Sequence, residues 1–234
     1  MIYHKSMVAG AIEIARADKN HLSLSCVLFD VDGTVAACNR FAIYAAQPTS
    51  EKMISSLHFP GDIRTGNQMA ISIDQLSKLI KAIPMDKQFA GRLEHFSIVQ
   101  DSQSANVEFN DGRAVVKHRL KLSKITASLG EYKNRLSEIA SKSGLVNRLK
   151  FVYNRSRLVS VVNAIESACK YNGEFAFIDK EPYENGEIWR AINEITGQMV
   201  VCAHVLPSAS STPEKSDWEK SIFKKKITLS KRGV

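Results

Sequence analysis

The chain has 234 residues, of which 44% are hydrophobic and 24% charged, so we expect a folded core and exclude a disordered chain. Its formal net charge is +8, but residues 214–234 carry seven basic and three acidic side chains and hold half of that excess. Its four cysteines form no Cys-x-x-Cys pair, and no segment approaches the roughly 20 apolar residues of a membrane span. We therefore expect a soluble, cytoplasmic protein without a metal or another cofactor.

The first predicted helix lies near the start of the chain and is followed by a predicted β-hairpin. The helix is indicated by apolar residues at helical spacing, namely Val8, Ala11, Ile12 and Ala15. Two predicted strands, Leu24 to Phe29 and Val35 to Cys38, flank Asp32-Gly33, whose residues tolerate the positive φ of a tight turn.

The second predicted helix spans 72–84, with Asp74 as its N-cap and Pro84 as its stop. One face of this helix is apolar, with Leu76, Leu79, Ile80 and Ile83. Three strands are expected after it, at Phe96 to Gln100, Ala105 to Phe109 and Val115 to Leu120, with a turn at Asp111-Gly112.

A short helix is predicted over Tyr132 to Ala140, and a longer one over 154–165, with Ser156 as its cap. The apolar stripe of the longer helix follows that of the second helix at a constant offset of 82 residues: Leu158, Val161, Val162 and Ile165. The strands expected next are Glu174 to Ile178, Ile188 to Ile192 and Val200 to Val205, with turns near Asn185-Gly186 and Thr196-Gly197.

These segments indicate a repeated unit of one amphipathic helix followed by a few strands. In two copies a glycine precedes a Val-Val pair, at Gly112 with Val115-Val116 and at Gly197 with Val200-Val201. The opening helix and hairpin form a fainter third copy. Beyond Pro207 we expect a linker and a mobile basic tail. The aromatic and basic residues of the tail offer contacts to nucleic acid or to a partner groove, and the alternative is a solubilising, disordered extension.

One short motif points to different chemistry. The run Val27 to Val35 contains Asp30-Val31-Asp32-Gly33-Thr34 and resembles the first motif of the haloacid-dehalogenase-like phosphatases. That resemblance implies a magnesium-dependent phosphatase in which Asp30 attacks phosphorus and Asp32 protonates the leaving group. The family's later acidic pair is not recognisable, either at Gly61-Asp62 or at Ile178 to Glu181. We therefore favour the hairpin, with the phosphatase as the alternative.

The ordered set of segments is similar to the bacterial sliding clamp, the β subunit of DNA polymerase III, and to its short phage- or plasmid-type relatives, over roughly residues 1–206. The resemblance is carried by the hairpin with Cys38-Asn39-Arg40-Phe41-Ala42, by Gly130-Glu131-Tyr132-Lys133-Asn134-Arg135, by the helix Leu158 to Ile165 and by Gln198 to Leu206. It implies an α+β fold of DNA-clamp-like repeats, each with one helix packed on antiparallel strands.

The same resemblance implies domain boundaries and a function. We expect a clamp-like domain of two modules at 1–122, a shortened second one at 123–206, and a linker with a basic tail at 207–234. A sliding clamp is not an enzyme. It is a homo-oligomeric processivity factor in DNA replication that encircles duplex DNA and binds DNA polymerase or other replication and repair proteins. A clamp-derived domain that has lost ring assembly and binds only proteins is a further alternative.

Site residues follow from the resemblance by position. The basic residues expected to face DNA are Lys5, Arg16, Lys78, Lys81, Lys133, Arg135, Arg155, Arg157 and Lys170. Partner proteins would dock near Val205 and Leu206, at the end of the last strand. The alternatives are an ordinary basic helix surface for the first group and ordinary core for the second.

Overall fold

The structure is a computed structural model and describes residues 1–16, 25–50, 67–85, 92–141, 155–169, 177–183, 186–193 and 196–205. The elements run in the order β1 (Ile2–His4), α1 (Lys5–Arg16), β2 (Cys26–Phe29), β3 (Val35–Cys38), β4 (Ala42–Ala46), β5 (Met69–Ser72), α3 (Ile73–Ala82), η2 (Arg92–Glu94), β6 (His95–Asp101), β7 (Ser104–Asn110), β8 (Val115–Ser123), α4 (Ala127–Gly130), α5 (Tyr132–Ser141), α6 (Arg155–Cys169), β9 (Phe177–Tyr183), β10 (Gly186–Ile192) and β11 (Met199–Val205).

The strands form an eleven-stranded sheet in the order β1-β6-β7-β8-β5-β2-β3-β4-β11-β10-β9. All pairings between the described strands are antiparallel. Strand β1, which precedes α1, pairs with β6, which follows α3. Strand β5, which precedes α3, pairs with β2, which follows α1. The sheet therefore links segments far apart in the chain, and β4 continues it into β11.

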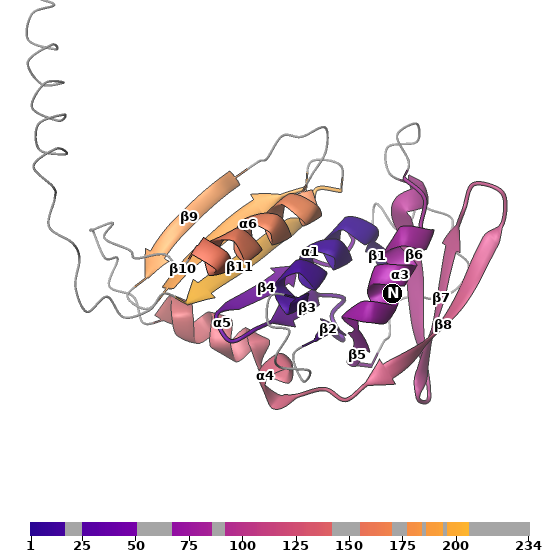
Figure 1. The fold of residues 1–234 in the computed structure, drawn as a ribbon, viewed down its shortest axis with the longest axis horizontal. Helices are drawn as coiled ribbons and strands as arrows, with labels where there is room; N and C mark the ends of the chain where they lie inside the picture. Colours follow the sequence, from indigo (N-terminus) through magenta and orange to yellow (C-terminus); the bar gives the residue numbers. More distant parts are fainter. Residues whose placement is uncertain are drawn as a thin grey trace, which may run out of the picture.

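Three helices cover one face of the sheet. In Figure 1 α1 lies between α3 and α6, and the three are side by side in front of the strands. Alternate residues of β2, Val27 and Phe29, point into the core below these helices. The approach of α1 to α6 depends on Gly10, because a Cβ at that position would lie 2.6 Å from the carbonyl oxygen of Ala164.

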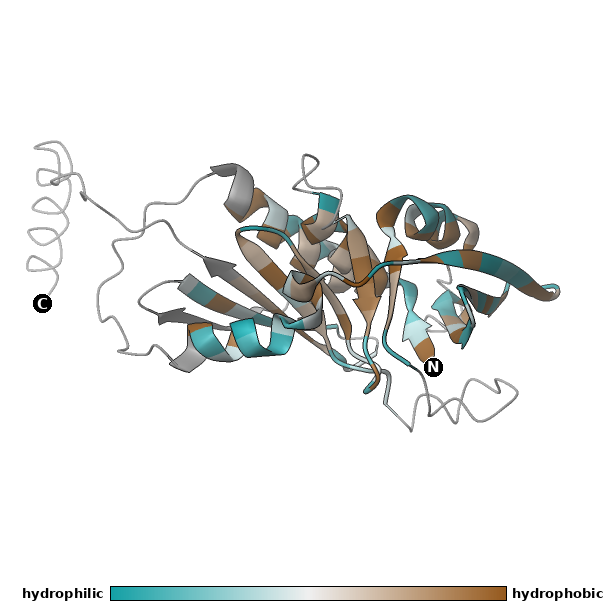
Figure 2. Cartoon of the chain, turned by 90° about the horizontal axis from the view of Figure 1, so that it is seen from below, coloured by the Kyte–Doolittle hydropathy of each residue, from teal (hydrophilic) through white to brown (hydrophobic). Residues whose placement is uncertain are grey.

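The opposite face of the sheet is covered by α4 and α5. The other alternate residues of β2, Cys26 and Leu28, belong to a second apolar cluster with Leu129 of α4 and Tyr132 of α5. The central strands are therefore buried on both faces and are apolar throughout, whereas the surface of α5 is hydrophilic (Figure 2).

The hairpin prediction is confirmed: β2 pairs with β3, and Gly33 adopts φ +85° in the turn. The turn at Asp111-Gly112 likewise joins β7 to β8, and the helix predicted from Tyr132 is α5. Two predicted caps are wrong: the N-cap of α3 is Ser72 and not Asp74, and α6 begins at Arg155, before Ser156.

Three strands were not predicted, namely β1, β4 and β5. Each is short and mostly apolar, without the alternation that marks a half-exposed strand, because nearly all of its side chains are buried. The strand expected at Glu174 to Ile178 is instead β9, and residues 174–176 lie outside the described ranges.

Candidate nucleic-acid interface

The layer formed by α1, α3 and α6 carries three of the basic residues predicted to face DNA. Lys78 and Lys81 are exposed on α3, and Arg16 is exposed at the end of α1. Arg16 is held by its neighbours: its guanidinium donates to Oε1 of Glu13 at 3.0 Å and to Oγ of Ser77, on α3, at 3.2 Å. The structure therefore brings Arg16 and the two lysines onto one layer.

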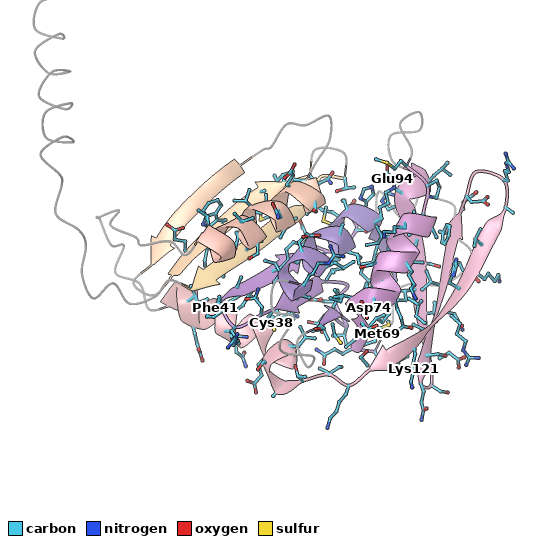
Figure 3. The ribbon with its side chains drawn as sticks, in the orientation of Figure 1. Cys38, Phe41, Met69, Asp74, Glu94 and Lys121 are labelled. Atoms are coloured by element: carbon cyan, nitrogen blue, oxygen red, sulfur yellow. The ribbon has the colours of Figure 1, made fainter. Side chains whose placement is uncertain are left out.

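Carboxylates on the same three helices offset this positive charge. Asp74 is exposed on α3 (Figure 3), and Glu13 on α1 and Glu166 on α6 are partly exposed. The described side chains of this layer thus include three accessible basic groups and three carboxylates. Arg155 and Arg157 of α6 add positive charge to this layer, but their side chains are not among those described, so the mixed surface holds only for the described part of the layer.

Lys5 does not belong to this surface. Its side chain is largely buried, and its ammonium group donates to the carbonyl oxygen of Pro84 at 2.6 Å and lies 3.4 Å from Oε2 of Glu94. The expectation that Lys5 faces DNA is corrected. Its contacts with Pro84, just beyond α3, and with Glu94 of η2 tie these two segments together.

Lys133 and Arg135 lie on α5, and α5 covers the face of the sheet opposite to α1, α3 and α6. These two residues therefore lie on the other side of the sheet from Arg16, Lys78 and Lys81, and one DNA surface cannot include all five. Sequence periodicity shows which side of a helix is apolar, but it does not show which face of a sheet that side covers.

The remaining predicted residues are only partly placed. Arg155 and Arg157 lie in the first turn of α6 and Val205 ends β11, but their side chains are not among those described. Lys170 and Leu206 lie outside the described ranges.

Asp30 and Asp32, the two residues of the phosphatase-like motif, both bind Lys133. Its Nζ lies 2.8 Å from Oδ2 of Asp30 and 2.8 Å from Oδ2 of Asp32. Asp30 is buried and also accepts hydrogen bonds from the hydroxyl of Tyr132 at 2.9 Å and from the backbone N–H of Val31 at 2.8 Å. The arrangement is an ion-pair cluster that connects the hairpin to α5.

Burial alone would raise the pKa of Asp30, but hydrogen bonds from Lys133, Val31 and Tyr132 outweigh it and hold the pKa below its ordinary value. The pKa of Asp32 is lowered in the same way, mainly by Lys133 and Thr34 against the effect of burial. Hydrogen bonds to the two carboxylates raise the pKa of Lys133. All three groups are therefore charged near neutral pH.

Backbone groups of the hairpin hold both aspartates, and for Asp32 the N–H of Thr34 donates to Oδ1 at 2.9 Å. The N–H of Asp30 donates to the carbonyl of Thr34 at 2.9 Å, and the N–H of Gly33 donates to the carbonyl of Asp30 at 3.0 Å. Within the described ranges, no three His, Cys, Asp or Glu side chains are grouped so that they could hold a metal ion. The position beside both carboxylates is taken by an internal cation, Lys133.

A further group of basic residues was not singled out from the sequence. The side chains of Lys117, Arg119 and Lys121 are exposed along β8, and Figure 3 shows Lys121 near the end of that strand. Two of them are paired, Lys117 with Glu108 at 2.8 Å and Arg119 with Asp101 at 3.2 Å. The alternation of charged positions along Val115 to Lys121 was the signal available for this exposed face.

No protein-family model and no curated protein matches this sequence. Among solved structures, the fold is similar to a chain of the complex described as the C-terminal region of FEN-1 bound to A. fulgidus PCNA. The TM-score is 0.53 at 10% sequence identity, and the match covers 90% of this chain and 98% of that chain.

The chain therefore has a sliding-clamp-like fold, as the resemblance of its segments predicted. The similar structure is of the PCNA type, so the finer prediction of a bacterial β-subunit type is not supported. No helix in the described part of the chain is long and apolar enough to span a membrane.

Proposed function

We propose that this protein is a sliding-clamp-like scaffold that assembles from several copies around duplex DNA and docks replication or repair proteins. The observation that carries the proposal is the likeness to a PCNA chain along nearly its whole length. A clamp performs no bond chemistry, so the protein is proposed not to be an enzyme. DNA would be held by weak, salt-dependent phosphate contacts from α1, α3 and α6.

Assembly from several copies is supported by the edge of β8. This strand pairs with β7 over Val115 to Lys121, but it reaches β5 only at Leu122 and Ser123. The Gln75 side chain occupies the edge at Lys121, where its Oε1 accepts from the N–H at 2.8 Å and its Nε2 donates to the carbonyl at 3.0 Å. Beyond this point the edge has no strand partner among the described residues.

Alternation then fixes which backbone groups face outward. Because the N–H and carbonyl of Lys121 point to Gln75, those of Arg119, Lys117 and Val115 point to the same open edge. Such an edge is a template for another strand. A second edge lies on β9, one of the two strands that end the sheet, whose sequence contains Asp179, Lys180 and Glu181. Pairing of β8 with β9 of another copy would be head-to-tail, which closes into a ring or extends into a filament.

Light scattering after size-exclusion chromatography tests the assembly, and retention on DNA tests its topology. We expect a closed oligomer that remains on nicked circular DNA at high salt and is lost when the same DNA is linearised. A monomer at high protein concentration, or equal retention on circular and linear DNA, would contradict the proposal.

The mixed charge of the described side chains of α1, α3 and α6, which do not include those of Arg155 and Arg157, favours a second candidate, a clamp-like scaffold that binds proteins but not DNA. The same retention assay separates the two functions, because this candidate predicts an oligomer without any retention on circular DNA. Docking of partners near Val205 and Leu206 is common to both candidates.

The phosphatase alternative has its own test. Turnover of a generic phosphomonoester that requires magnesium and disappears in Asp30→Asn would support that alternative and contradict the proposed absence of catalysis. Because Lys133 already neutralises Asp30 and Asp32, we expect no such turnover.

A further inference from the structure

The segment Ala127–Ser141, which contains α4 and α5 and is called the strap below, covers an apolar face that the sheet would otherwise expose. Beneath it lie Leu28, Cys38, Ile43, Ile188 and Ala203, all of them buried. A sheet face of this kind, if uncovered, is an apolar surface of the sort that marks interaction sites.

The strap has little apolar attachment of its own. Among its described side chains, Leu129 and Tyr132 are buried, while Leu136 and Ile139 are only partly covered. The other described positions of α5 are largely polar, and several are exposed. A ten-residue helix is marginal in water when it is not docked, so α5 depends on its contacts with the sheet to remain helical.

A polar contact fixes the strap at the start of α5. Lys133 bridges Asp30 and Asp32, and the adjacent Tyr132 donates to the same Asp30 carboxylate. The Lys133 side chain is about half exposed, whereas that of Asp30 is 7% exposed, so a partly exposed ammonium group neutralises an almost fully buried carboxylate. Loss of Lys133 leaves this buried carboxylate without its charged partner, which is costly as long as the strap stays docked.

We infer that the strap is a detachable cover latched by Lys133 onto Asp30 and Asp32, and that its release opens the apolar sheet face beneath it. The inference rests on the contacts of the strap and does not depend on the proposed function. When the latch opens, Asp30 and Asp32 regain water and α5 loses its support, so undocking and unfolding of the strap occur together.

Hydrogen exchange followed by mass spectrometry tests the latch in the full chain. In Lys133→Ala we expect amides of 129–141 to exchange roughly tenfold faster than in the wild type, while amides of α1 and β2 keep their rates. Binding of the dye ANS should rise in the same variant. The matched control is Lys78→Ala, an exposed lysine on α3, which should change neither signal.

Unchanged exchange of 129–141 in Lys133→Ala would overturn the inference. An equal acceleration in every element would overturn it as well, because it would show global destabilisation and not local release. Should Lys133→Ala fail to fold, Asp32→Asn removes one partly exposed carboxylate and must still accelerate exchange of the strap selectively. Raising the salt concentration from 0.1 M to 1 M should also accelerate exchange of amides 129–141 in the wild type, because partly exposed ion pairs are screened.

Discussion

The hydroxyl of Tyr132 donates a 2.9 Å hydrogen bond to Oδ2 of Asp30, a residue 102 positions earlier in the chain. Both side chains are buried, and the bond joins α5 to the end of β2. Two residues that belonged to separate motifs in the sequence, the Asp-Val-Asp-Gly-Thr run and the Tyr-Lys pair, therefore form one structural unit with Lys133.

Tyr132→Phe should lower the free energy of unfolding by about 1–3 kcal/mol, because it removes a hydrogen bond to a buried carboxylate while keeping the ring. Urea unfolding followed by circular dichroism measures the loss. Tyr132→Leu should be less stable still, since it also removes the ring from the second apolar cluster. Equal stability of Tyr132→Phe and the wild type would show that the hydrogen bond contributes nothing net.

The aspartate cluster predicts how stability depends on pH. The pKa values of Asp30 and Asp32 are lowered in the folded state, so their contribution is fully present above the ordinary value of 3.8 and is lost as the pH falls through the folded values. In that window the unfolded state binds more protons, so the free energy of unfolding decreases on acidification. Unfolding in urea between pH 2.5 and pH 6 tests this, and Asp32→Asn should flatten the acid side of the curve.

Gly10→Ala should destabilise the protein, because the added Cβ would meet the carbonyl oxygen of Ala164 at 2.6 Å and the hydroxyl of Tyr44 at 2.7 Å. We expect a loss of about 1–3 kcal/mol in thermal or urea unfolding as α1 and α6 are pushed apart. The control is Gly130→Ala at the end of α4, where the nearest atom to an added Cβ is 3.6 Å away. If Gly10→Ala lost no more stability than Gly130→Ala, the helices α1 and α6 would be able to move apart at little cost.

Lys117→Pro should reduce self-association without unfolding the subunit. The N–H of Lys117 points to the open edge of β8, so proline removes a donor that a neighbouring strand would use and no donor that β7 uses. Sedimentation at several concentrations should show a shift towards monomer, with the circular dichroism spectrum retained. Lys117→Ala keeps the N–H and is the control, so a similar shift in both variants would point to the side chain and not to the strand edge.

Local interactions made part of this architecture predictable. The spacing of Leu76 and Leu79, the Asp-Gly turns and the apolar strand before Asp30 depend on neighbouring residues, and they give α3, two hairpins and β2. The repeated order of these segments also indicated the clamp-like fold, because the order of elements restricts how a sheet can be assembled.

Tertiary structure alone decided the features that join distant segments. β1, β4 and β5 are three to five residues long and carry no periodic signal, so only their pairing with remote strands defines them. The side of the sheet on which α5 lies, and with it the partnership of Lys133 and Asp30, depends on how the chain crosses the sheet. The sequence by itself therefore determined the longer helices, the hairpin turns and the class of fold. The tertiary structure decided which charges meet, because contacts between distant residues are set by packing and not by spacing along the chain.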